Sequence, residues 1–258
     1  MRARIMGTEI HYELCGEGSR RVVLLHGWGA SVQLMRPVAD ALEKDMRVLL
    51  VDFPPFGESG RPSGDWGVPE YAEALLTLLR QEDFLPCSVI AHSFGARVAI
   101  YLASNDHSLF DKLILTGAAG LRKPQTEEGK KRAAEFKRLK ACCETARKLK
   151  VFGKLPDVVE DRLREKYGSA DYNALDADMR RTFVKVISLD LSDRLKNIGQ
   201  PTLLVWGDRD TETPLWMGQK MEKEIPDAGL VVFEGGTHFA YLEQAARFNI
   251  IASKFLLG

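Results

Sequence analysis

Ser93, Asp210 and His238 occur in this order along the chain, and each follows a short apolar run that is typical of a buried strand. The runs that precede them are Val89-Ile90-Ala91, Leu203-Leu204-Val205-Trp206 and Leu230-Val231-Val232-Phe233. In open α/β sheets ligands bind beyond the carboxyl ends of the strands, so we expect the three side chains to meet at one edge of a sheet. A histidine that is oriented by a carboxylate can take the proton of a serine hydroxyl. The pattern therefore predicts nucleophilic chemistry at Ser93.

Ser93 lies in the segment Ala91-His92-Ser93-Phe94-Gly95, between a predicted strand and a predicted helix. Small residues two positions to either side permit the sharp turn of a nucleophile elbow, although alanine stands at 91 where the pattern usually has glycine. The helix N-terminus behind the serine would offer N–H groups to an oxyanion. The alternative is that Ser93 caps the following helix, because similar segments occur by chance.

A glycine-rich segment, His26-Gly27-Trp28-Gly29, follows another apolar run. Its glycines would let the backbone turn close to the nucleophile, so the N–H groups of Trp28 and Phe94 are the candidate oxyanion donors. Alternatively, the segment is a turn that joins a strand to a helix. Because His26 precedes the turn, we expect it to be a hydrogen-bonding structural residue and not a base. His26, Gly27 and Phe239 are also candidate pocket residues.

Two aspartates compete for the acidic position, since Gly207 is followed by Asp208-Arg209-Asp210. We prefer Asp210 because it lies further beyond the strand and closer to Pro214, whereas Asp208 is more typical of a residue that caps a loop. His238 lies before the last predicted helix, in a loop that Gly235 and Gly236 make flexible. A lone loop histidine can, however, also be a surface residue. The other histidines are weaker candidates. They are His11 in the opening hairpin, His92 in the elbow and His107 after an Asn-Asp turn.

Short β-branched runs alternate with helical patterns along most of the chain. Runs without polar alternation are typical of strands that are buried on both faces, so we predict an α/β fold whose twisted, mostly parallel sheet has helices on both faces. The predicted strands are 22–25, 48–51, 89–91, 113–115, 203–206 and 230–233, and the predicted helices are 31–43, 69–82, 94–103, 214–224 and 242–257. Alternation at Ile10, Tyr12 and Leu14 predicts an opening antiparallel hairpin.

Residues 121–196 interrupt this alternation, because no strand pattern occurs there. Apolar residues recur at helical spacing between Ala133 and Ala146, and further helical patterns cover 156–167 and 176–189. We therefore predict a helical cap at 121–196, inserted into an α/β core formed by 1–120 and 197–258.

The composition excludes several classes of protein. With 258 residues, 45% hydrophobic, the chain can bury a large core and is not a disordered protein. Its four cysteines form no C-x-x-C motif, which argues against a zinc ribbon and favours reduced thiols in the cytoplasm. No apolar run approaches the roughly 20 residues of a membrane helix, and the N-terminus does not resemble a signal peptide. We expect a cytoplasmic monomer or dimer.

Charge is balanced over the whole chain but not along it. The 36 basic and 36 acidic residues give a net charge of zero, which predicts no general attraction to nucleic acid or to membranes. Residues 121–150, however, hold 11 Lys and Arg against 4 Asp and Glu, so they carry +7 and the remainder carries −7. This basic part of the predicted cap is either a solvated helix face or a device that attracts anionic substrates.

Together these segments resemble the α/β-hydrolase family over the whole chain. The segments that carry the resemblance are His26–Gly29, Asp52–Ser59, Ala91–Gly95, Gly207–Asp210 with Pro214, and Gly236–Phe239. The resemblance implies Ser93 as nucleophile, Asp210 as acid and His238 as base, with no metal and no cofactor. One departure is Pro55, which replaces the first glycine of the family pattern Asp-x-Pro-Gly-x-Gly-x-Ser and predicts a stiffer loop.

A serine nucleophile argues against the branches of this family that use aspartate or cysteine. We therefore expect acyl transfer from the ester of a small carboxylic acid to water. One alternative is hydrolysis of a carbon–carbon bond next to a ketone in an acidic substrate, which the basic cap motivates. The other is a ligand sensor that keeps the triad but turns over little, since a fold does not by itself determine a function.

Overall fold

A computed structural model of the chain describes residues 1–123, 127–149, 158–159, 162–163, 166 and 170–258. The chain forms two compact units, of which the larger comprises Met1–Leu121 and Lys185–Gly258 and the smaller Arg122–Val184. The helix predicted at 156–167 lies mostly outside the described residues. No helix within the described ranges has the length and apolarity needed to cross a membrane.

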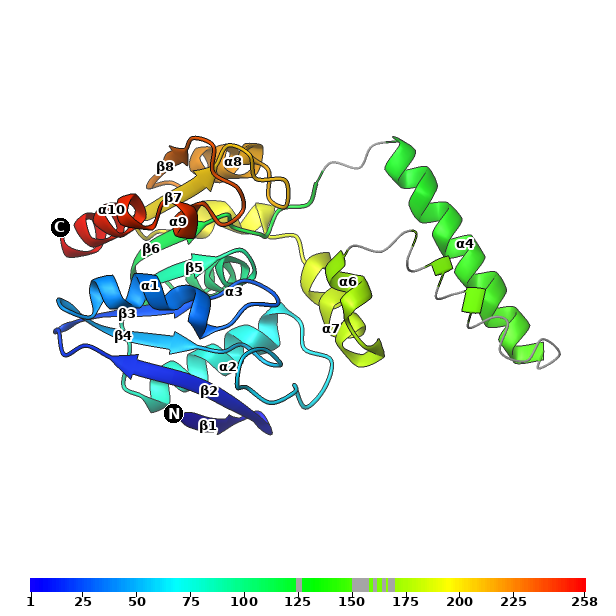
Figure 1. Cartoon of the computed structure of the whole chain (residues 1–258), viewed down its shortest axis with the longest axis horizontal. Helices are drawn as coiled ribbons and strands as arrows, with labels where there is room; N and C mark the ends of the chain where they lie inside the picture. The colour runs from blue at the N-terminus through cyan, green and yellow to red at the C-terminus, as the bar shows by residue number, and fades with distance from the viewer. Residues whose placement is uncertain (124–126, 150–157, 160–161, 164–165, 167–169) are drawn as a thin grey trace. The chain divides into compact units, whose positions relative to one another are not determined.

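The larger unit is built on an eight-stranded sheet with the order β1-β2-β4-β3-β5-β6-β7-β8 (Figure 1). Only the pairs β1/β2 and β2/β4 are antiparallel, and all other neighbours run parallel, which confirms the predicted sheet. The strands are β1 (Arg2–Ile5), β2 (Thr8–Cys15), β3 (Arg20–Leu25), β4 (Met46–Val51), β5 (Cys87–His92), β6 (Phe110–Thr116), β7 (Thr202–Gly207) and β8 (Ala228–Phe233).

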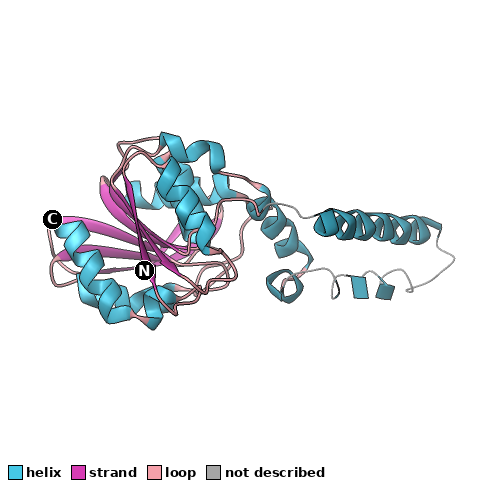
Figure 2. Cartoon of the chain, turned by 90° about the horizontal axis from the view of Figure 1, so that it is seen from above, coloured by secondary structure: helices cyan, strands magenta, loops and turns pink. Residues whose placement is uncertain are grey.

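Helices cover both faces of this sheet (Figure 2). Consecutive residues of β3 enter different cores, because Val23 packs with one cluster of buried side chains and Leu24 with the other. Because both faces of the strands are buried, their sequences are continuous apolar runs in which polar residues do not alternate with apolar ones. One cluster includes residues of α2 (Val68–Gln81), α3 (Phe94–Ala103) and α8 (Leu215–Glu224), and the other includes residues of α1 (Val32–Leu42), α9 (Ala240–Glu243) and α10 (Ala245–Leu257).

Two predicted boundaries differ from the structure. The closing helix expected at 242–257 is divided into α9 and α10, because Gln244 leaves the helical conformation with φ −119° and ψ 45°. Residues 185–196, which the prediction assigned to the cap, belong to the larger unit. The reason is burial: Val186, Leu191 and Leu195 are part of its core.

The smaller unit is helical in its described residues. It holds α4 (Glu127–Leu149), α6 (Ala170–Ala174) and the first part of α7 (Ala177–Ser188). Along α4 the predicted apolar positions are unevenly covered, since Cys143 is buried, Phe136 and Leu139 are half-buried and Ala133 is exposed. The helix therefore buries only a narrow apolar seam, and most of its described side chains face solvent.

Candidate active site

Ser93 occupies a strained turn between β5 and α3. Its φ of 50° and ψ of −108° fall where residues other than glycine are uncommon, and such strain is concentrated at functional sites. The Ser93 side chain makes no capping hydrogen bond to α3, so the structure gives no support to the alternative that it is an ordinary helix cap. At Gly95 an added Cβ would lie 2.6 Å from the Leu25 carbonyl oxygen, so the turn requires glycine there.

The glycine-rich segment after β3 lies directly against this turn. The Gly95 N–H donates to the His26 carbonyl oxygen at 3.1 Å, and a Cβ added at Gly27 would lie 3.3 Å from Ser93 Cβ. Phe94 begins α3, and Trp28 follows Gly27 in the adjoining loop. Both predicted oxyanion donors are therefore main-chain groups of segments that adjoin Ser93.

An aspartate and a histidine form a hydrogen-bonded pair beyond β7 and β8. Asp210 Oδ2 lies 2.8 Å from His238 Nδ1, while its Oδ1 accepts the main-chain N–H groups of Glu212 and Thr213, each at 2.9 Å. Burial alone would raise the pKa of Asp210, but the hydrogen bonds and charge of its neighbours, His238 first, outweigh burial and hold it below its usual range. Asp208 is exposed, so the structure brings Asp210 to the histidine.

The end of β6 joins the serine turn to this pair, because β6 lies between β5 and β7. The Ser93 N–H donates to the Thr116 carbonyl oxygen at 3.1 Å. The next residue, Gly117, has a φ of +49°, and a Cβ added there would lie 3.1 Å from His238 Nδ1 and 3.3 Å from Asp210 Oδ2. Ser93, Asp210 and His238 therefore border the same short piece of backbone at one sheet edge. Sequence reasoning missed Gly117, although a glycine directly after a predicted strand was a visible signal.

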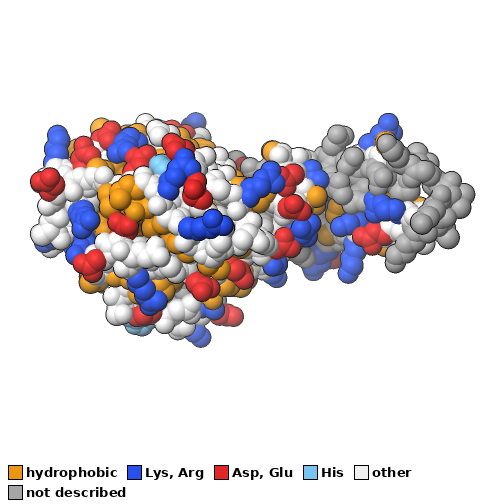
Figure 3. All heavy atoms as spheres, turned by 90° about the horizontal axis from the view of Figure 1, so that it is seen from below, with side chains coloured by type: hydrophobic (Ala, Val, Ile, Leu, Met, Phe, Trp, Pro, Cys, Tyr) orange, Lys and Arg blue, Asp and Glu red, His pale blue; other side chains and the backbone are white. Residues whose placement is uncertain are grey.

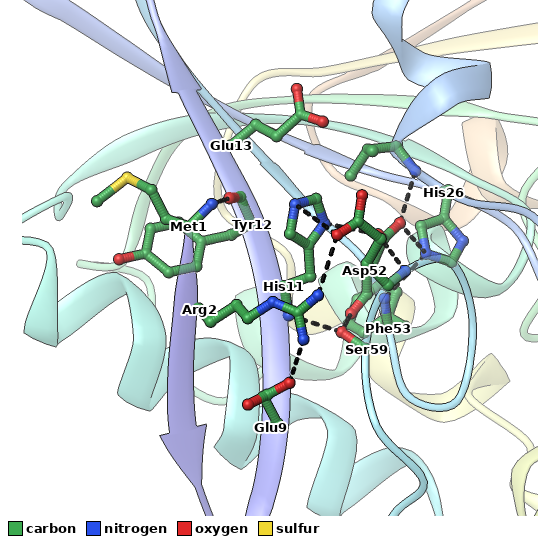
Figure 4. A network of polar contacts seen from close by, with 12 residues as sticks. Met1, Arg2, Glu9, His11, Tyr12, Glu13, His26, Asp52, Phe53 and Ser59 are labelled. Carbon is green, nitrogen blue, oxygen red and sulfur yellow. Dashed lines mark hydrogen bonds and ion pairs between the residues drawn. The ribbon is translucent and has the colours of Figure 1, made fainter.

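Asp52, directly after β4, lies in a network of polar contacts beside His11 and His26 (Figure 4). Its buried Oδ1 accepts the N–H of Val32, the first residue of α1, at 2.7 Å. Its Oδ2 accepts the N–H of Glu58 at 2.9 Å and lies 2.8 Å from His11 Nδ1. A Cβ at Gly57 would lie 2.1 Å from the Asp52 carboxyl carbon, so only glycine permits this approach. One carboxylate thus ties together three segments of chain.

His26 does not line a pocket, contrary to one of the two roles expected for it. Its side chain is 0% exposed, its Nε2 accepts the Phe53 N–H at 2.9 Å, and its Nδ1 lies 2.7 Å from the Gly27 carbonyl oxygen. Burial also lowers the pKa of His26, so the ring is neutral. It is a structural residue of the loop. Gly27 is buried against the serine turn, whereas Phe239 is 40% exposed and can face a ligand.

We expect Asp52→Ala to lower the free energy of unfolding by about 3–5 kcal/mol, because it leaves two main-chain N–H groups and His11 without their buried acceptor. Urea unfolding followed by circular dichroism measures the change. The control is Glu58→Ala in the same network: its side chain is 64% exposed and pairs with Arg2, so the expected loss is at most about 1 kcal/mol. Equal losses in the two variants would contradict the role given to Asp52.

Aromatic rings flank the serine turn on the side of the glycine-rich loop. The half-buried Trp28 packs edge-to-face on Phe56 and Phe94, with ring centroids 4.9 and 5.3 Å apart. Phe94 in turn packs on Phe53 and Tyr71. This wall is apolar and suits the uncharged part of a ligand. Among the described residues, no group of three or more His, Cys, Asp or Glu side chains is placed to hold a metal ion.

The sheet, the strained serine turn after β5 and the hydrogen-bonded Asp210 and His238 after β7 and β8 have the arrangement of an α/β fold with a nucleophile elbow. Residues 22–249 match the alpha/beta hydrolase family, and the chain belongs to that family. A 2-hydroxy-6-oxononadienedioate/2-hydroxy-6-oxononatrienedioate hydrolase of Escherichia coli is 27% identical to this chain over an alignment of 267 positions. The alignment covers 96% of this chain and 90% of the relative.

Solved structures share the fold at lower identity. A meta-cleavage product hydrolase from Pseudomonas fluorescens is 22% identical with a TM-score of 0.73, covering 99% of this chain and 96% of its own. An enol-lactonase from Burkholderia xenovorans is 21% identical with a TM-score of 0.76, covering 100% of both chains. A thermophilic esterase from Thermogutta terrifontis is 22% identical with a TM-score of 0.73, covering 99% of this chain and 98% of its own.

Proposed function

We propose that the protein is a serine hydrolase that cleaves the carboxylic ester of a small molecule through an acyl-enzyme. The observation that carries the proposal is the hydrogen bond between His238 Nδ1 and Asp210 Oδ2 at the sheet edge where Ser93 stands in its strained turn. This hydrogen bond places the proton on Nδ1, so Nε2 of the imidazole is the basic nitrogen.

The proposed reaction has two halves. In the first, His238 Nε2 takes the proton of Ser93 Oγ as the oxygen attacks the ester carbonyl, and the Trp28 and Phe94 N–H groups stabilise the oxyanion. The tetrahedral intermediate then expels the alcohol, which leaves with the proton from His238. In the second half, His238 removes a proton from water, the hydroxide attacks the acyl-enzyme, and Ser93 regains its proton as the acid departs. Ionised Asp210 stabilises the imidazolium in both halves.

A fluorophosphonate probe and a panel of aryl esters test this proposal together. We expect the probe to modify one serine, Ser93, identified by mass spectrometry of the digested protein. We also expect repeated turnover of the esters, which separates an enzyme from a ligand sensor that keeps the triad. No labelling of Ser93, or hydrolysis that continues after complete labelling, would contradict the assignment.

Cleavage of a carbon–carbon bond is the second candidate function. Two observations favour it: the identity of 27% to hydrolases that are named for ketone-containing dicarboxylic acids, and the charge of +7 in residues 121–150. The same triad serves this reaction, but the substrate is a dianion, whereas the wall formed by Trp28, Phe56 and Phe94 is apolar. On the face of the larger unit that Figure 3 shows, charged side chains of both signs are interspersed, so that face does not form a single field for an anion.

The two candidates predict opposite preferences in one assay. We expect kcat/KM for a neutral aryl ester to exceed that for a 2-hydroxy-6-oxo dienoic diacid, measured in the same buffer at two ionic strengths. A higher kcat/KM for the diacid that falls as salt is added would favour carbon–carbon hydrolysis and a substrate attracted by charge.

A further inference from the structure

His92, the residue before the nucleophile, is buried in the centre of the site. It contacts two segments that are far apart in sequence, residues 238–241 and the loop at Gly27. Its Nε2 lies 3.0 Å from the main-chain oxygen of His238, and its ring packs on the rings of His238, Phe239 and Tyr241 at centroid distances of 4.6, 5.1 and 4.9 Å. Its opposite edge faces Gly27, where an added Cβ would lie 2.8 Å from His92 Nδ1.

The loop that carries His238 joins β8 to α9 and belongs to neither element, so contacts with other segments fix its position. The Asp210 carboxylate holds the side chain of His238 through Nδ1. The hydrogen bond from His92 holds its main chain, and it comes from the end of β5, the strand that leads into Ser93. These two contacts, one on the ring and one on the backbone, both constrain where Nε2 of His238 lies.

We propose that His92 is a positioning residue: its Nε2–H anchors the main chain of His238 to the nucleophile strand, so that the basic Nε2 of His238 is presented to Ser93. This inference rests on the proposed serine hydrolase function. It assigns a role to a histidine that does not itself touch the reacting atoms.

The surroundings of His92 favour a neutral imidazole that donates a hydrogen bond. Burial, and then the neighbouring His238, lower the pKa of His92 to about 3, so the ring stays uncharged at any working pH. Because the His238 oxygen can only accept, the proton of His92 must be on Nε2, which leaves Nδ1 as a bare acceptor. That Nδ1 is buried with no hydrogen-bond partner among the described residues. A neutral ring also avoids repelling the imidazolium that His238 forms during turnover.

Three variants test the proposal. His92→Phe keeps an aromatic ring but removes the donor, and we expect kcat to fall about 10–100-fold with little change in KM, because a small misplacement of a catalytic group is this costly. His92→Gln has its amide nitrogen the same number of bonds from Cβ as His92 Nε2, so we expect it to recover most of the loss. His107→Phe is the control: this exposed histidine also bonds a main-chain oxygen, that of Asn197, and we expect wild-type kcat.

A double-mutant cycle separates positioning from a general loss of structure. In an Asp210→Asn background His238 carries its proton on Nε2 and cannot accept the proton of Ser93, so the exact position of Nε2 matters little and His92→Phe is expected to cost far less than it does in the wild type. The rate at which a fluorophosphonate modifies Ser93 should fall in parallel with kcat in His92→Phe.

The outcomes distinguish this inference from the proposed function. If the wild type turns over esters and Ser93 is labelled, but kcat of His92→Phe stays within about twofold of wild type, the positioning role is wrong and the hydrolase assignment stands. Equal losses in His92→Phe and His92→Gln, or full additivity with Asp210→Asn, would also overturn it. If Ser93 of the wild type is never labelled, the proposed function fails, and the role of His92 fails with it.

Discussion

Replacing Ser93 by alanine is expected to lower kcat for ester hydrolysis by about 10⁶-fold, because in the proposed reaction the hydroxyl oxygen forms the acyl-enzyme and nothing in alanine can replace it. The residual rate would come from the oxyanion donors and from substrate binding, which remain in place. Steady-state kinetics with an activated aryl ester, chosen for a low background rate, measures the loss.

The matched control is Ser104→Ala, at the other end of the helix that Ser93 precedes. Within the part of the chain that the structure describes, the Ser104 hydroxyl donates to the Tyr101 carbonyl oxygen alone, so we expect kcat to be unchanged. Both variants should unfold at nearly the wild-type temperature. Ser93→Ala that keeps more than about a hundredth of the activity would show that another nucleophile, or water acting directly, carries the reaction.

The chain order of Ser93, Asp210 and His238 is a sufficient signal for the pair of Asp210 and His238, because these two residues follow the neighbouring strands β7 and β8. Ser93 follows β5, which only β6 separates from β7. Buried strands have a strong local signature, and parallel order places their carboxyl ends together. The choice of Asp210 over Asp208 also agrees with the structure, since the main chain between them turns Asp210 inward to the N–H groups of Glu212 and Thr213.

The supporting contacts are not visible in the sequence, since they join residues that are far apart along the chain. His92 meets His238 across 146 positions, and Asp52 meets His11 across 41. Each is one polar residue in an apolar neighbourhood, and nothing local says which partner it has. Such contacts follow from the packing of loops on a completed sheet, so they become predictable only once the topology is known.

The boundary between the two units was missed for a related reason. The segment 185–196 continues the helical pattern of the predicted cap, yet Leu191 and Leu195 are fully buried with the larger unit. Helical periodicity says that one face is buried but does not identify the surface that buries it. A prediction from periodicity therefore assigns such a segment to the element that precedes it.

The acid of the pair gives the second large effect: Asp210→Asn is expected to lower kcat by about 10⁴-fold. Asp210 Oδ1 accepts two main-chain N–H groups, so the carbonyl oxygen of an asparagine must take that place. Its NH2 group would then stand where Oδ2 is and would point at His238 Nδ1, 2.8 Å away in the wild type. His238 would have to present a bare Nδ1 to this donor and carry its proton on Nε2, where it could not accept the proton of Ser93.

Asp208→Asn is the control that the sequence itself supplies. Asp208 lies two residues away and is exposed, so the same change of chemistry there should leave kcat unaltered. Both variants keep the shape of the side chain. Thr213 Oγ1 donates to Asp210 Oδ2 and also lies 3.0 Å from the Gly117 carbonyl oxygen. In Asp210→Asn this hydroxyl can therefore donate to Gly117 instead. The loss in Asp210→Asn would therefore reflect the tautomer of His238 and not a collapsed loop. Equal activity in the two variants would mean that the carboxylate does not orient the base.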